Sequence, residues 1–139
     1  MIKPTDKVYI SGEMSKYKDA DYNRPRFNAM EKLIKELFPS VVVLNPARHP
    51  DGLAYNTYME YAMIDVKECD VMVQLNGWHN SPGAQKERAE AVNLGKNIIR
   101  EENIWRTSPA DIKTNLTLTK LDIRHTAEEI EEFAQNILL

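Results

Sequence analysis

One glutamate, Glu87, is placed where a carboxylate could act as a nucleophile. The stretch Asp70–Gly95 (DVMVQLNGWHNSPGAQKERAEAVNLG) predicts a buried strand over Val71–Leu75, then a turn, then a helix that opens at Ser81-Pro82-Gly83 and ends at Gly95. Glu87 falls about one turn inside this helix. A carboxylate in that position can attack the anomeric carbon of a sugar, because a nearby negative charge stabilises an oxocarbenium-like transition state.

The start of the same helix predicts an anion site. Ser81 can cap the helix with its hydroxyl, and the amides of Gly83 and Ala84 are expected to lie free at that end. Together they would hold a phosphate or a carboxylate. Two alternatives stay open on the pattern alone: Ser-Pro-Gly also fits an ordinary helix cap, and Glu87 also fits a solvated position among charged neighbours.

Three expected strand ends should meet at one edge of a sheet: Ser11-Gly12, Asn45-Pro46 and the loop Asn76–Gly83. Ligands of open α/β sheets bind at such an edge. Gly12 lets the backbone approach a ligand closely, and Asn45 is expected to border the pocket. Trp78, in the loop before Ser81, could stack on a base or cover the site; a packed rim aromatic is the alternative.

The elements that must position these residues alternate between strand and helix. Helices are expected at Arg24–Phe38, with Pro25 in its first turn, and at Asn56–Lys67. Short apolar runs predict four strands, at Lys7–Ser11, Val41–Leu44, Val71–Leu75 and Asn97–Arg100. This order predicts an α/β fold, a Rossmann-like doubly wound parallel sheet of four to five strands with helices on both faces.

The C-terminal part of the sequence is less regular. Glu101–Lys120 has no firm periodicity, although Leu116, Leu118 and Leu121 could alternate as an edge strand. Thr126 and Glu129 fit a capping box for an acidic amphipathic helix over 127–139. We expect residues 1–139 to form a single domain, with the helix at 126–139 packing on it or on a partner subunit.

Composition narrows the classes of function. The chain has 139 residues, a net charge of −3 and an ordinary hydrophobic share of 42%. This charge offers no basic field for nucleic acid, and we expect none as a partner. Cys69 is expected to be a buried thiol, and the three histidines lack metal-ligand spacing, so no metal or cofactor is predicted. No secretory signal or membrane span is evident, which predicts a cytoplasmic protein.

Several segments in order resemble the nucleoside 2-deoxyribosyltransferase superfamily, and within it the short phage and bacterial branch. The matching pieces are KVYISGEMS, Asn23 with Phe27, VVVLNPA, YMEYAMIDVKECDVMVQLNGW and SPGAQKERAEAVNLGKNI, which together cover roughly residues 7–100. The resemblance implies a flavodoxin-like sheet, homo-oligomers, and cleavage or exchange of N-glycosidic bonds in nucleosides or nucleotides.

Residue by residue, the resemblance places the family's catalytic glutamate on Glu87, the tyrosine that contacts it on Tyr9, and the loop glycine on Gly12. Ser81 stands where deoxyribosyltransferases of free nucleosides have an aspartate. The 2'-deoxynucleoside 5'-monophosphate N-hydrolases have a phosphate-binding serine there. The resemblance therefore favours a nucleoside 5'-monophosphate as the substrate.

Two positions depart from the family pattern. Ala62 stands where the family has an aspartate proposed to protonate the leaving base, and Asp65, about one turn later, is the substitute in this sequence. The first loop has Ser15 near the place of an arginine, and Glu13 adds a negative charge there. The leading hypothesis is N-glycosidic hydrolysis or deoxyribosyl transfer through Glu87. The alternatives are a non-catalytic nucleotide-binding protein on the same fold and a structural partner protein.

Overall fold

The computed structural model describes residues 2–14, 20–50, 52–107 and 126–138. Four strands form an all-parallel sheet in the order β2-β1-β3-β4. The strands are β1 (Lys7–Ser11), β2 (Val42–Leu44), β3 (Val71–Gln74) and β4 (Asn97–Arg100). The chain leaves β1 for β2 on one side and later reaches β3 on the other. The carboxyl ends of β1 and β3 therefore form the switch point at which such sheets bind ligands.

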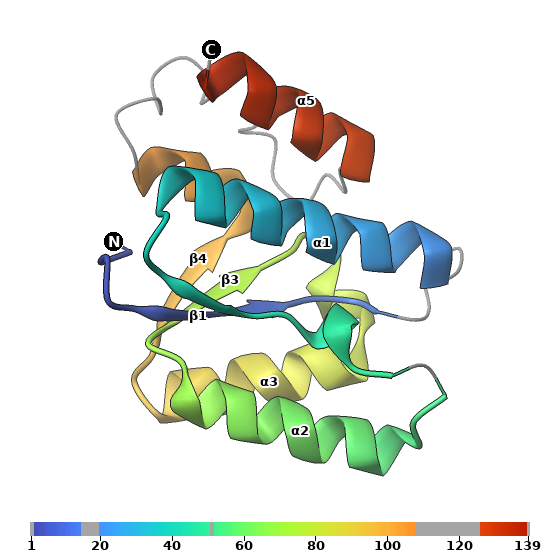
Figure 1. Cartoon of the computed structure of the whole chain (residues 1–139). Coiled ribbons are helices and arrows are strands. Elements are labelled where there is room, and N and C mark those ends of the chain that lie inside the picture. Colours follow the sequence, from blue (N-terminus) through green and yellow to red (C-terminus); the bar gives the residue numbers. More distant parts are fainter. Residues whose placement is uncertain (1, 15–19, 51, 108–125, 139) are drawn as a thin grey trace.

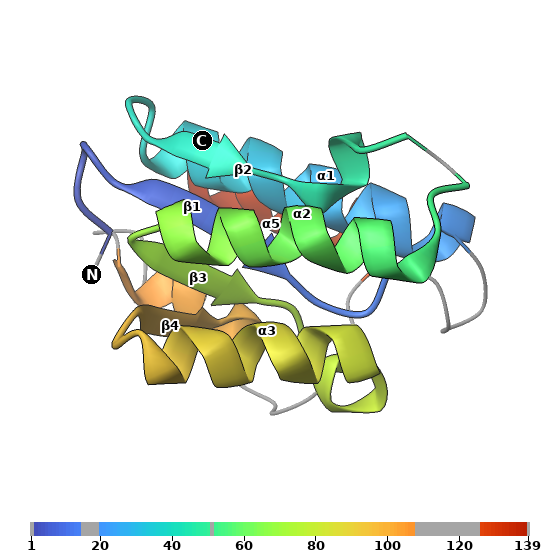
Figure 2. The same cartoon turned by 90° about the horizontal axis from the view of Figure 1, so that it is seen from below.

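Helices cover both faces of the sheet, as the sequence predicts. Helices α1 (Ala20–Leu37) and α5 (Ala127–Leu138) lie on one face, and α2 (Tyr55–Glu68) and α3 (Pro82–Asn93) lie on the other (Figure 1). Seen from below, α2 and α3 run side by side across their face (Figure 2). In the described part of the chain, a short 3-10 segment follows each of β2, β3 and β4: η1 (Pro46–Arg48), η2 (Trp78–Asn80) and η3 (Glu101–Thr107).

Alternation along β1 divides the core between the two faces. Val8 and Ile10 pack with α1 in the larger cluster, whereas Tyr9 points to the opposite side and packs with Val66 and Met72. Successive side chains of a strand point to opposite faces, so a short apolar strand serves both layers. Tyr9 therefore lies under α2 and α3, on the side where Glu87 stands.

Element bounds differ from the expected ones by a few residues, mostly at the ends. The largest difference is at α1, which begins at Ala20, so that Pro25 lies in its second turn and not in its first. The predicted end of the third helix, at Gly95, also lies beyond the observed one: α3 ends at Asn93 and Leu94 is its C-cap. The possible edge strand near Leu116–Leu121 lies outside the described residues.

Helix α5 begins with the predicted capping box. The Glu129 amide donates to Thr126 Oγ1 at 3.2 Å, and the Thr126 amide donates back to Glu129 Oε1 at 3.4 Å. The helix packs against α1, and Ile130 is buried in the core on that face. The sequence pattern thus located this helix and one of its inward residues correctly.

No helix in the described part of the chain is both long and apolar enough to cross a membrane. Among the same residues, no group of three or more histidine, cysteine, aspartate or glutamate side chains could hold a metal ion.

Candidate functional site

A pocket of about 400 Å³ opens at the switch point between β1 and β3. Three short segments line it: residues 12–14 after β1, Tyr55, Tyr58 and Met59 of α2, and residues 81–84 with Glu87 at the start of α3. Five of the residues predicted from the sequence thus meet in one place: Gly12, Ser81, Gly83, Ala84 and Glu87. A volume of this size is typical of small-molecule sites.

Glu87 is buried at the wall of this pocket and not solvated. Its exposed fraction is 4%, and the Ser11 hydroxyl donates a hydrogen bond of 2.7 Å to its Oε1 atom. Helix α3 turns Ala84, Glu87 and Ala91 inward, which excludes the solvated alternative. Leu94, seven residues after Glu87, is exposed because the helix has ended by that position.

Burial raises the pKa of Glu87 to about 7, and the Ser11 hydrogen bond and nearby Tyr9 oppose this shift. The Tyr9 hydroxyl is close enough to lower the pKa of Glu87, but it forms no hydrogen bond of normal geometry with any described residue. Burial, and secondarily the Glu87 charge, raises the pKa of Tyr9 in turn. A carboxylate with a pKa near 7 can ionise at neutral pH, so it can serve as a nucleophile or as an acid-base group.

The N-terminus of α3 faces the same pocket. Ser81 is its N-cap, and its Oγ atom accepts a hydrogen bond of 3.2 Å from the Ala84 amide. The Ala84 amide is therefore occupied, contrary to the expectation that it is free. Within the described residues the Gly83 amide donates no hydrogen bond, and the Ser81 hydroxyl keeps its own proton to donate. These two donors and the helix dipole favour an anion.

Two glycines allow close packing around the site. A Cβ at Gly12 would lie 3.0 Å from the Leu75 Cβ and 3.3 Å from Phe27 Cζ. A Cβ at Gly83 would lie 3.2 Å from the Met59 sulfur, so the glycine lets α3 pack close to α2. Both contacts are tighter than ordinary van der Waals distance. Gly12 thus lets the first loop pack against Leu75 and Phe27 of the core, and Gly83 lets the start of α3 pack against Met59.

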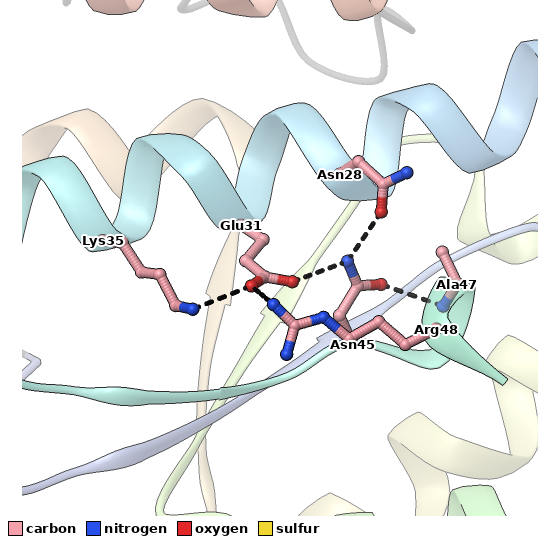
Figure 3. A network of polar contacts seen from close by, with 6 residues as sticks. All are labelled: Asn28, Glu31, Lys35, Asn45, Ala47 and Arg48. Carbon is pink, nitrogen blue, oxygen red and sulfur yellow. Dashed lines mark hydrogen bonds and ion pairs between the residues drawn. The ribbon is translucent and has the colours of Figure 1, made fainter.

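The structure does not bring Asn45 to the pocket. Its side chain caps η1 by accepting a hydrogen bond of 2.9 Å from the Ala47 amide, and its own amide donates to Asn28 and Glu31, at 3.0 Å each. Glu31 also pairs with Lys35 and Arg48, and the whole network lies between α1 and η1 (Figure 3). Asn45 follows β2, on the far side of β1 from β3, and its hydrogen-bonding groups are used in holding that turn.

Trp78 and Asp65 are also outside the set of residues that line the pocket. The Trp78 ring lies under the Arg88 guanidinium, with 4.7 Å between the guanidinium carbon and the ring centre. Asp65 Oδ2 lies 3.8 Å from His49 Nε2, and burial raises the pKa of Asp65 above its usual value. The charge of Asp65 contributes, after burial, to the raised pKa of Glu87 and of Tyr9.

Several lining residues were not predicted as site residues from the sequence. Tyr55, Tyr58 and Met59 form the α2 wall, and Met14 and Glu13 belong to the first loop. Glu13 is buried and faces the pocket, so its charge does not point away from the site. The helical spacing of these three α2 residues is the available signal, but the same spacing is also typical of an ordinary packed face.

Comparisons with known proteins support the fold but name no activity for this chain. A structure of CMP N-glycosidase BcmB from Clostridium botulinum is similar, with a TM-score of 0.50 and 20% sequence identity. The match covers 94% of this chain and 97% of that one, and at this identity it shows a shared α/β fold. No curated protein sequence matches significantly. A family model described as a domain of unknown function (DUF4406) matches residues 6–100, and the chain therefore belongs to that family.

Proposed function

We propose that the protein cleaves the N-glycosidic bond of a nucleoside or deoxynucleoside 5'-monophosphate, by hydrolysis or by deoxyribosyl transfer. The observation that carries this proposal is a buried glutamate, Glu87, at the wall of a pocket that also contains a helix N-terminus. The two features lie about one helical turn apart on α3. This separation suits a ligand whose reactive carbon and anionic group are a few ångströms apart, as in a sugar phosphate.

Glu87 is the proposed nucleophile. Its carboxylate attacks the anomeric carbon, the carbon–nitrogen bond breaks, and the base leaves with the electron pair of that bond. Water, or the base of a second nucleoside, then opens the resulting ester. The Ser11 hydrogen bond orients the carboxylate for attack and leaves one carboxylate oxygen to react. With a pKa of about 7, Glu87 ionises on approach to neutral pH, and we expect the rate to rise over that range.

The Ser81 hydroxyl and the Gly83 amide are the proposed phosphate ligands. Both belong to the first turn of α3, whose dipole favours an anion. The buried Glu13 carboxyl group in the first loop opposes an anion on that side of the pocket. The proposal therefore places the phosphate at α3 and leaves the aromatic α2 wall to the base.

The similar structure supports the chemical class of this proposal. That protein is described as an N-glycosidase acting on CMP. The resemblance of residues 7–100 to nucleoside 2-deoxyribosyltransferases points the same way, and Ser81 matches the serine of the monophosphate N-hydrolases. Both arguments concern the class of reaction, and neither selects a base or a sugar.

The test is release of free base from a panel of ribo- and deoxyribonucleoside 5'-monophosphates, followed by liquid chromatography. We expect the wild-type protein to release base from at least one of them and Glu87→Ala to abolish release. Glu90→Ala is the matched control, because Glu90 lies on the same helix and does not line the pocket.

Absence of base release from every nucleotide would contradict catalysis. Calorimetric titration of the same panel would then distinguish the two remaining hypotheses. Tight binding, with the nucleotide recovered intact, would indicate a nucleotide-binding protein. No binding at all would leave a structural role.

A further inference from the structure

Cleavage of an N-glycosidic bond needs a proton donor as well as a nucleophile, and this inference rests on the proposed function. The departing base takes the electron pair of the carbon–nitrogen bond, and a positioned acid stabilises it by proton transfer. Glu87 must be ionised to attack, so it cannot supply this proton at the same moment. A second group in the pocket has to do so.

We propose that the hydroxyl of Tyr58 donates this proton to the departing base. Tyr58 lies in the first turns of α2 and lines the pocket, as does Tyr55, three residues earlier on the same helix. It shares the pocket with Glu87, because α2 and α3 pack against each other along this face of the sheet (Figure 2). The base, held by the α2 wall, is thus within the same cavity as the nucleophile and this donor.

The surroundings of Tyr58 favour the protonated form of its hydroxyl group. Burial raises the pKa of Tyr58 above its usual value, and the charge of Glu87 adds to this effect. An ionised Glu87 therefore favours the protonated phenol beside it. The nucleophile and the donor can thus hold the required charge states at the same pH. The raised pKa also makes the phenol a weaker acid, so it gives up its proton only to a base nitrogen that gains negative charge as the bond breaks.

Other groups near the site are less suited to this role. Ala62, about one turn after Tyr58 on α2, is buried and has no proton to give. Asp65 pairs with His49 and does not line the pocket. Tyr9 is fully buried and does not line it either. Glu13 does line it, and the experiment must separate an acid-base role of its carboxyl group from that of Tyr58.

The step balances in atoms and electrons. The Glu87 oxygen forms a bond to the anomeric carbon, the bond to the base nitrogen breaks, and the Tyr58 proton moves to that nitrogen. The water that later opens the ester gives its hydroxyl to the sugar and its proton to the Tyr58 oxygen. The sum is one nucleotide and one water in, one sugar phosphate and one base out.

Tyr58→Phe tests the proposal, since it removes the hydroxyl and keeps the ring. For the nucleotide of the panel that wild type cleaves fastest, we expect kcat to fall by roughly 10²-fold or more with little change in KM. A second substrate, 4-nitrophenyl ribofuranoside 5-phosphate, releases a nitrophenolate that needs no proton. We expect its cleavage to change by less than about fivefold. Tyr61→Phe is the matched control, because Tyr61 is exposed on the same helix and lies outside the pocket.

Four results would overturn the assignment. An unchanged kcat would exclude proton donation by Tyr58, and a change confined to KM would indicate binding alone. Equal losses on both substrates would indicate a structural role. If Glu13→Gln gave the leaving-group pattern and Tyr58→Phe did not, Glu13 would be the donor. Failure of the proposed function is distinct from all of these, because the wild-type protein would then release no base.

Discussion

At the scale of single residues, Glu87 is held at the expense of stability. Its carboxyl group is buried and receives one hydrogen bond of normal geometry from the described residues, from Ser11. A charge in such a place is poorly solvated, which is why the pKa rises to about 7 from 4.5. Buried ionisable side chains with shifted pKa values are common in functional sites. An apolar or fully paired side chain at such a position would make the protein more stable, so the carboxyl group is consistent with a functional role.

Replacing Glu87 by glutamine should reveal this cost as a function of pH. Between about 4.5 and 7 the folded protein binds more protons than the unfolded chain at this position, so the stability contributed by Glu87 falls as pH rises. Glutamine does not titrate. We expect Glu87→Gln to match wild type near pH 4.5 apart from a constant offset, and to gain about 2–3 kcal/mol relative to it by pH 8.

Urea unfolding of both proteins at several pH values measures this gap, with Glu90→Gln as the control that should show no such trend. A gap independent of pH would mean that Glu87 titrates normally. Because both proteins keep Glu101, whose pKa burial also raises to about 7, the contribution of that second carboxyl group cancels in the difference.

The residues of the site differ in how far the sequence could predict them. The helix start at Ser81 put Glu87 among the positions that can turn inward, but the pattern alone left a solvated position open. The family resemblance is what places the catalytic glutamate there. Tyr58 could not be predicted, because α2 carries tyrosines at 55, 58 and 61, and only the packing against α3 separates the partly buried one from the exposed pair. Asn45 was assigned to the pocket from its place after a strand, but β2 lies at the edge of the sheet, on the other side of β1 from the pocket.

At the scale of elements, the first turn of α3 combines a structural and a proposed binding role in Ser81. Two substitutions separate these roles. Ser81→Ala removes the cap and should destabilise the protein by about 1 kcal/mol. Ser81→Asp keeps a capping oxygen and should remain within a few tenths of a kcal/mol of wild type. Its negative charge, however, occupies the proposed phosphate position.

Binding should therefore follow charge and not stability. In a Glu87→Gln background, which prevents turnover, we expect Ser81→Asp to weaken the affinity for a nucleoside 5'-monophosphate by at least about tenfold. Affinity for the corresponding free nucleoside should change little. Calorimetry with the two ligands makes the comparison, and equal losses for both would show that α3 does not hold the phosphate.

The strands and helices themselves were predictable because each rule acts over a short stretch. Four apolar runs gave the four strands, and Ser81 with Pro82 marked the start of α3. Ends were less certain. Pro25 suggested a helix beginning there, but α1 begins about one turn earlier, at Ala20, and contains Pro25.

At the scale of the whole molecule, the question is whether α5 completes the core of its own chain. The sheet divides the core into two clusters, and the larger one lies under α1. Ile130 of α5 is 2% exposed in that cluster, where it joins residues from β1 and α1. This contact favours packing of α5 on its own chain over packing on a partner, the alternative that the sequence leaves open.

Ile130→Ala should therefore lower the free energy of unfolding by about 2–4 kcal/mol, the usual cost of emptying a buried aliphatic site. Glu131→Ala, at the next and exposed position, should change it by less than about 0.5 kcal/mol. The decisive measurement is the loss of unfolding free energy caused by Ile130→Ala, compared at several protein concentrations. If α5 packs on its own chain, that loss is independent of concentration, because folding of this contact is unimolecular. If α5 packs on a partner, the loss grows on dilution, since the contact then also depends on association.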